Sequence, residues 1–273
     1  METWAQDQAE LHHFHAIRHW VFEHTGLHYP ERKYSTLYHR LKKLCNQLNL
    51  DSLAALNHAL QYNKGTDLAV QLACAVSTNH TFFFREREIF EFFETKIVPS
   101  LPVAEPWRIW SAACSGGDEA YTLALILAEK IGLSQTSSRV SILGTDISQT
   151  ALQQAELAIY SERRIEQVPP YLQSRYFQPK GLGQWALRPD IRNLCVFRRL
   201  NLMSEPWPFK NQFHVIFCRN VLYYFDQADQ IKLVERLYDL TAPGGWLITS
   251  VTESLRMLPT RWQVVSTGIH RKL

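Results

Sequence analysis

The sequence predicts an α/β protein: a mostly parallel, helix-covered sheet that is preceded by a small all-helical domain. Up to Phe93, apolar residues recur at helical spacing, and no stretch alternates like a strand. Beyond that point, short apolar runs typical of buried strands alternate with helical patterns, which indicates βαβ units. A chain of 273 residues is long enough for two domains of ordinary size.

Four helices are predicted in the first part. The first follows the apolar spacing of residues 11–22, and the second follows that of residues 37–48. Asp51 and Ser52 supply an N-cap for a third helix that runs to residue 60. A fourth helix covers residues 67–76.

Three prolines that disfavour helix continuation mark the boundary between the two parts, at positions 99, 102 and 106. We therefore expect a helical domain over residues 1–95, a linker over 96–106 and a second domain over 107–273.

The second part contains five predicted strands, at residues 108–113, 140–146, 194–200, 213–219 and 245–251. Predicted helices lie at residues 119–131, 149–159 and 227–240. Residues 262–272 are split by Thr267-Gly268 and predict an antiparallel hairpin at the sheet edge. A segment rich in glycine, proline and aromatics is too long for a simple connection, and it predicts an inserted antiparallel β-subdomain at about residues 174–198.

Composition excludes several classes of protein. A net charge of +3 is too small for a general nucleic-acid binder, and no apolar run reaches the length of a membrane span. The five cysteines are scattered without a C-x-x-C pair, which disfavours disulfides and zinc. His12, His15 and His19 have helical metal-ligand spacing but no carboxylate or cysteine pattern nearby, so we predict no metal site. We expect a cytoplasmic monomer.

Candidate ligand-binding residues follow the predicted strands, because ligands of open α/β sheets bind at the carboxyl ends of the strands. The first strand leads into the glycine turn 113–119, where Asp118 and Glu119 suit an ammonium or sulfonium group. The alternative is that both carboxylates only stabilise the helix N-terminus. Asp146 ends the second strand, where an acidic side chain typically binds ribose hydroxyls; the alternative is a cap for the helix that begins at Ser148.

Two further segments carry polar residues in unusual positions. Arg219 and Asn220 end an apolar strand; the arginine can bond backbone carbonyls, and the asparagine can present its amide to a ligand. In the first part, three consecutive phenylalanines suit a contact between the domains, which leaves Asn79, Thr81 and Arg85 available for a ligand.

These residues carry a resemblance to the CheR family of S-adenosylmethionine-dependent methyltransferases, which esterify glutamates of bacterial chemotaxis receptors. The matching motifs are TNHTFFFRE, RIWSAACSGGDEAYTLALIL, ILGTDIS, LNL, FHVIFCRNVLYYF and LTAPGGWLITSVTES. The resemblance implies a class I, Rossmann-like methyltransferase domain with an inserted β-subdomain, preceded by an all-α domain that docks receptors and completes the cofactor site.

The resemblance also implies a cofactor, S-adenosylmethionine, with S-adenosylhomocysteine as product. The implied cofactor contacts are Asn79, Thr81, Arg85, Glu119, Asp146, Asn201, Leu202, Asn220 and Val221. We expect Arg85 to orient the acceptor carboxylate and Tyr223, or alternatively Tyr224, to line the acceptor channel. Of these contacts, only Asn201 and Leu202 rest on the resemblance alone.

The expected partner is the cytoplasmic domain of a chemotaxis-type receptor, without nucleic acid and without membrane insertion. Docking is expected on a basic helix face made of Lys33, Arg40, Lys42 and Lys43, although a solvated face is the alternative. The glycine turn and the segment 251–254 depart from the family pattern, and the hairpin 179–189 is short for gripping a receptor tail. A methyltransferase with another acceptor and a catalytically inactive adaptor therefore stay open.

Overall fold

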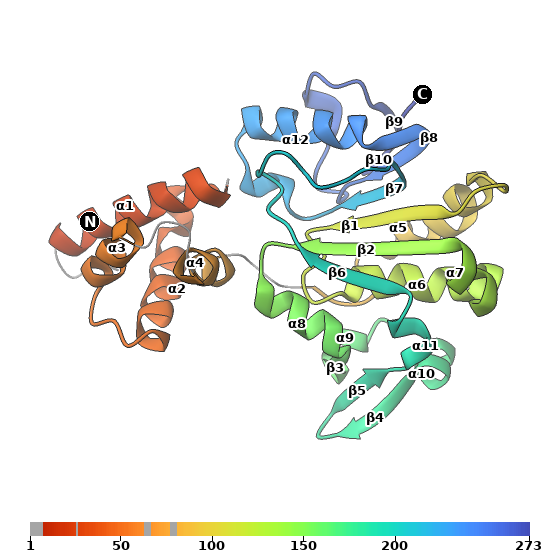
Figure 1. Ribbon diagram of the computed structural model, residues 1–273, viewed down its shortest axis with the longest axis horizontal. Coiled ribbons are helices and arrows are strands. Elements are labelled where there is room, and N and C mark those ends of the chain that lie inside the picture. Colours follow the sequence, from red (N-terminus) through yellow and green to blue (C-terminus); the bar gives the residue numbers. More distant parts are fainter. Residues whose placement is uncertain (1–7, 26, 63–66, 77–80) are drawn as a thin grey trace.

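The computed structural model describes residues 8–25, 27–62, 67–76 and 81–273. Figure 1 shows the N-terminal helices gathered beside a larger α/β unit. These helices are α1 (Gln8–Thr25), α2 (Tyr34–Gln47), α3 (Leu53–Tyr62) and α4 (Asp67–Val76), with a 3₁₀ turn at Glu31–Lys33. Their apolar stripes form one core around Phe14, Ile17, Leu37, Leu41 and Leu56. The helical periodicity of the sequence reflects this shared core.

The segment after residue 80 differs from the expected boundaries. Helix α5 (Arg87–Phe92), a π-helical segment (Phe93–Ile97) and a 3₁₀ turn (Val98–Ser100) pack in the core of the α/β unit, where Phe93 contacts Phe217 edge to face. Val98 and Leu101 are buried as well. The boundary at residue 95 and the first half of the expected linker 96–106 are therefore wrong, because these apolar side chains belong to the core of the α/β unit. Residues 103–106 are exposed, as expected of a connection.

The α/β unit is built on a seven-stranded sheet with the order β6-β2-β1-β7-β8-β10-β9. Its strands are β1 (Trp107–Ala112), β2 (Val140–Asp146), β6 (Cys195–Arg199), β7 (Phe213–Cys218), β8 (Thr241–Ile248), β9 (Gln263–Ser266) and β10 (Ile269–Arg271). The first five in this order are mutually parallel, and β10 and β9 close the edge in antiparallel fashion. This arrangement confirms the predicted fold class.

Alternating side chains of the strands build a separate core on each face of the sheet. On one face, Ile109 and Phe217 pack with α6 (Asp118–Ile131). On the other, Trp110 and Ile216 pack with α12 (Gln227–Asp239). Two more helices, α7 (Leu133–Arg139) and α8 (Gln149–Leu157), flank β2. Both faces are covered, as the continuous apolar strands predict.

The inserted β-subdomain contains the predicted hairpin, but its limits differ from the expected 174–198. Strands β4 (Phe177–Gly181) and β5 (Gln184–Leu187) pair as expected, and β3 (Ile159–Ser161) adds a third antiparallel strand. Short helices α9 (Glu162–Ile165), α10 (Pro170–Tyr176) and α11 (Pro189–Arg192) complete the insertion. Strand β6 belongs to the main sheet instead. Sequence periodicity missed β3 because three residues carry too little of the alternating pattern.

Within the described ranges, no helix is long and apolar enough to cross a membrane.

Candidate functional site

The glycine turn between β1 and α6 has an unusual backbone conformation. Ala113, Ser115 and Gly117 all lie in the left-handed region, with φ values of 61°, 50° and 86°. Two of these residues are not glycine, and such strain persists only where surrounding contacts over-determine it. A side chain at Gly117 would also lie 2.8 Å from the Ala155 Cβ atom. The turn is therefore a preset loop at the carboxyl end of β1.

Asp146 is one of the contacts that hold this turn. Its carboxylate accepts hydrogen bonds from the backbone N–H of Ser115 and of Ser148, both at 2.8 Å. The cap of α8 is Ser148 itself, whose hydroxyl accepts from Ala151 N–H. Burial raises the pKa of Asp146, and the two backbone donors oppose that rise. Asp146 thus joins β1 to β2 at the sheet edge where a ligand would bind.

The variant Asp146→Asn tests this bridge. One of the two backbone N–H groups would face an amide NH₂ instead of an acceptor, so the glycine turn should lose its fixed geometry. We expect the Kd for S-adenosylmethionine to rise about 10–100-fold, the size of one lost hydrogen bond to a charged group. Isothermal titration calorimetry measures this, with Asp51→Asn at an exposed position of the helical domain as the control. An unchanged Kd would show that Asp146 is not needed for binding.

The adjacent carboxylates Asp118 and Glu119 have different environments. Asp118 is fully buried and pairs with the Arg164 guanidinium from α9. Glu119 accepts from the Ser111 hydroxyl at 2.6 Å and pairs with Arg219 at 3.0 Å. Burial raises the pKa of Glu119, and Arg219 only partly offsets it. Of the two, Glu119 is therefore the carboxylate that a bound cation can reach.

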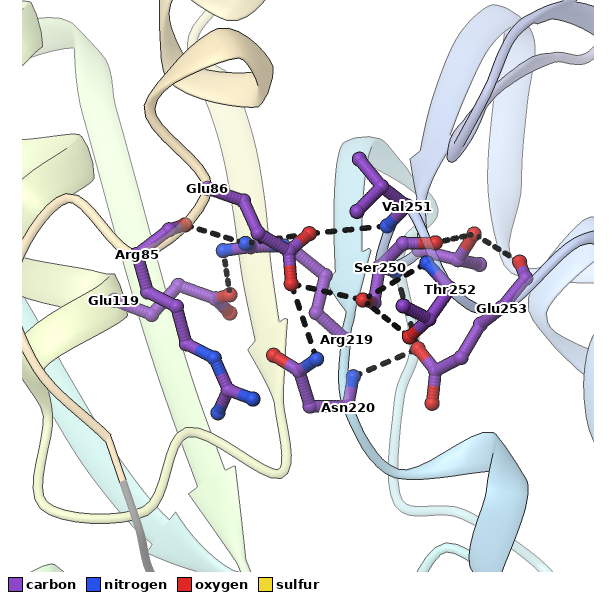
Figure 2. A network of polar contacts seen from close by, with 10 residues as sticks. Arg85, Glu86, Glu119, Arg219, Asn220, Ser250, Val251, Thr252 and Glu253 are labelled. Atoms are coloured by element: carbon purple, nitrogen blue, oxygen red, sulfur yellow. Dashed lines mark hydrogen bonds and ion pairs between the residues drawn. The ribbon is translucent and has the colours of Figure 1, made fainter.

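Arg219 lies at the centre of a network that joins three segments of the chain (Figure 2). Its guanidinium pairs with Glu119 and with Glu86 at 3.2 Å, and donates to the Arg85 carbonyl oxygen at 2.5 Å. The side chain is only 3% exposed, and its Nε has no protein partner among the described residues. A buried donor without a protein partner is uncommon in folded proteins.

Glu253 anchors the loops that follow β7 and β8. Its carboxylate accepts from the backbone N–H groups of Asn220 at 2.7 Å, Leu222 at 2.8 Å and Ser250 at 3.1 Å. Burial raises the pKa of Glu253, while these donors oppose the rise. Segment 251–254, which departs from the family pattern, therefore retains a defined structural role at the site.

A pocket gathers several of the predicted cofactor residues. Its lining includes Thr81, Arg85, Glu119 and Asn220 from the predicted set, together with Phe82, Phe90, Ala113, Cys114, Ser115 and Arg219. Asp146 joins through its bond to Ser115. Acidic, amide and arginine groups together fit a ligand that carries a cation, a carboxylate and hydroxyls. The residues present therefore fit S-adenosylmethionine.

The other predicted cofactor residues are placed differently. Asn79 lies outside the described residues. Asn201 accepts from Met203 N–H at 2.9 Å through its side chain, and Leu202 packs in the core under α12. Val221 is partly buried and packs against both that core and the core of the helical domain. None of these last three lines the pocket above.

Tyr223 lies next to one of the predicted docking residues. Tyr223 is 47% exposed, and Lys33 lies 5.5 Å from the ring centres of both Tyr223 and Tyr224. Arg40 donates to the Tyr29 hydroxyl and to the Val76 carbonyl oxygen. Lys42 pairs with Glu10, and Lys43 is exposed. The basic face is therefore partly engaged inside the helical domain, because Arg40 and Lys42 hold its helices together.

Sequence reasoning missed Glu86, Arg164 and the role of Glu253. Each bonds to partners far along the chain, and the local sequence gives no signal for such pairs. In the described part of the chain, no group of three or more His, Cys, Asp or Glu side chains is placed to hold a metal ion.

Comparison with known proteins identifies the family of the chain. Residues 79–270 match the family model "CheR methyltransferase, SAM binding domain", and residues 12–73 match "CheR methyltransferase, all-alpha domain". The chain is 33% identical over 242 residues to the chemotaxis protein methyltransferase of Borreliella burgdorferi, covering 86% of each chain. It is 36% identical over 232 residues to chemotaxis protein methyltransferase 1 of Pseudomonas aeruginosa, covering 83% of this chain and 84% of that protein. The chain therefore belongs to the CheR family of chemotaxis protein methyltransferases, and it is an S-adenosylmethionine-dependent methyltransferase.

Proposed function

We propose that this protein methylates glutamate side chains in the cytoplasmic domain of a chemotaxis receptor, giving methyl esters. The observation that carries the proposal is the pocket at the carboxyl ends of β1 and β7, where Arg85, Glu119 and Asn220 converge. The family membership supplies the reaction class and the chemotaxis context.

Different residues of the site would contact different groups of S-adenosylmethionine. Glu119 suits the ammonium group, Asp146 suits the ribose hydroxyls beside the glycine turn, and Arg85 suits a carboxylate. Thr81 and Asn220 supply further polar contacts, and Asn201 with Leu202 is assigned to the adenine by family resemblance. When bound, the cofactor supplies a methyl group on a cationic sulfur.

The chain's own contribution is positioning. A glutamate acceptor is ionised at neutral pH, so it needs no general base. Opposite charges cancel as a carboxylate reaches the methyl group, and a water-poor pocket favours that progress. Arg85 and Tyr223 would hold the acceptor in line with the methyl group, and such orientation lowers the barrier of a two-reactant step.

The acceptor helix would approach over the helical domain. Lys33 lies beside Tyr223, and the exposed Lys43 lies on the same helical domain. Acidic residues on a receptor helix would be attracted to this surface, which favours encounter and correct register more than affinity. Arg40 and Lys42 contribute to the positive field but are held by internal contacts.

Transfer of labelled methyl from S-adenosylmethionine to receptor-bearing membranes tests the proposal. A carboxyl methyl ester releases volatile methanol on treatment with alkali, and we expect this result. A base-stable label would identify a different acceptor atom. If the protein binds the cofactor but transfers no methyl group to receptors, its acceptor is another protein or a small molecule. If it does not bind the cofactor, the catalytically inactive adaptor is favoured.

A further inference from the structure

The Glu86 carboxylate bridges three segments of the site. One oxygen accepts from the Asn220 side-chain amide at 3.1 Å and from the Ser250 hydroxyl at 2.8 Å. The other accepts from Val251 N–H at 3.0 Å and pairs with Arg219 at 3.2 Å. Burial acts to raise the pKa of Glu86, but Arg219 and these donors outweigh it and hold the pKa below its ordinary value. Glu86 is therefore an ionised acceptor.

This ionised state fixes the orientation of Asn220. A carboxylate can only accept hydrogen bonds, so the Asn220 group that faces Glu86 must be the NH₂ donor. The amide oxygen of Asn220 is then turned away from Glu86, on the side of the Arg85 guanidinium (Figure 2). Asn220 and Arg85 both line the cofactor pocket, so the oxygen lies on the side of Asn220 that faces another residue of the pocket.

The backbone of Glu86 and of Asn220 has an uncommon conformation. Glu86 has a φ of 63° and Asn220 a φ of 58°, so both residues lie in the left-handed region. Asparagine adopts this region more readily than most residues, but a glutamate there is uncommon and persists only where surrounding contacts hold it. Their side chains meet although the residues are 134 positions apart in the sequence.

We propose that Glu86 is a positioning residue that holds the Asn220 amide with its oxygen toward the cofactor. With Glu119 in the same pocket, this oxygen makes the site rich in acceptors, which suits the ammonium-bearing end of S-adenosylmethionine. The inference rests on the cofactor site of the proposed function and names the residue that sets its donor and acceptor pattern.

The variant Glu86→Gln should exchange the donor and the acceptor of the Asn220 amide. The oxygen near Arg219 and Val251 N–H must stay an oxygen, because both neighbours are obligate donors. The new NH₂ group therefore faces Asn220, whose amide must turn over to accept from it. An NH₂ group then points into the pocket, where it meets the donor groups of the cofactor.

Calorimetric titration with S-adenosylmethionine and with S-adenosylhomocysteine measures the consequence without relying on activity. We expect Glu86→Gln to raise both Kd values about 10–100-fold. Asn220→Asp alone should also weaken binding, because it places two carboxylates against each other. The double variant Glu86→Gln with Asn220→Asp should restore binding to near the wild-type level. In that protein the new amide at position 86 donates to the new carboxylate at position 220, and an acceptor again faces the pocket with the net charge unchanged.

Matched variants keep the test decisive. Glu88→Gln makes the same charge change at an exposed residue two positions away and should leave both Kd values unchanged. Asn220→Gly accepts the positive φ and removes the amide, so it should weaken binding as much as Glu86→Gln does. A double variant no better than its worse parent, or full binding by either Glu86→Gln or Asn220→Gly, would overturn the inference. Absence of binding by the wild-type protein would instead refute its assigned cofactor site.

Discussion

Replacement of Arg219 by methionine is expected to destabilise the folded protein by about 3–5 kcal/mol at neutral pH, the usual cost of leaving a buried charge without its partner. Arg219 serves two carboxylates, since Glu86 and Glu119 are only 15% and 13% exposed and both pair with it. It also donates to the Arg85 carbonyl oxygen, so the variant should lose affinity for S-adenosylmethionine as well.

The effect of Arg219→Met should depend on pH with a defined sign. Arg219, together with the hydrogen-bond donors around Glu86, holds the pKa of Glu86 below its ordinary value against burial. The stabilisation from this pair is therefore present above the unfolded carboxyl pKa and is lost on acidification. Burial already raises the pKa of Glu119, and without Arg219 it rises further. Both carboxylates can bind protons in acid. The difference in unfolding free energy between the wild type and Arg219→Met should therefore become smaller from about pH 8 to about pH 5.

Urea unfolding at the two pH values measures this gap. The exposed Arg261, which pairs with Glu235 and Asp239, offers a control: Arg261→Met should cost no more than about 1 kcal/mol. Equal losses from the two variants, or a gap that widens in acid, would contradict the central role of Arg219.

Replacement of Arg164 by methionine is the second change with a large expected effect, again about 3–5 kcal/mol. Asp118 is fully buried, and its pKa is raised by burial against the opposing charge of Arg164. The Arg164 guanidinium also lies 4.8 Å from the centre of the Tyr160 ring, whose hydroxyl donates to the Gly116 carbonyl oxygen at 2.8 Å. The inserted subdomain thereby supports the glycine turn.

The double variant Arg164→Met with Asp118→Asn separates the lost pairing from lost packing. Replacing both charged partners often costs little, so we expect the double variant to be more stable than Arg164→Met alone. The thermal midpoint and the denaturant midpoint of the wild type, the two single variants and the double variant complete the cycle. Additive losses would show that the two side chains do not interact energetically.

Sequence reasoning predicted the elements and strand ends of the site because both follow from local patterns. Apolar runs and helical periodicity place β1, β2, β7 and α6, and parallel strands bring their carboxyl ends to one edge. Glu119, Asp146 and Asn220 were therefore expected at that edge before any geometry was known. The errors lie where the local pattern is weak. Strand β3 has only three residues, and the prolines of segment 96–106 favoured a linker although Ile97, Val98 and Leu101 are buried.

What the sequence determined by itself was the fold class, the family and the edge of the sheet that carries the chemistry. Only the tertiary structure decided which partner each charged side chain at that edge binds. Asp118 and Glu119 are neighbours in sequence, but successive helical residues point about 100° apart, so one meets Arg164 and the other meets Arg219. Glu86 bonds to Ser250 across 164 positions. No local pattern encodes such partners, because long-range pairing is set by how the whole chain packs.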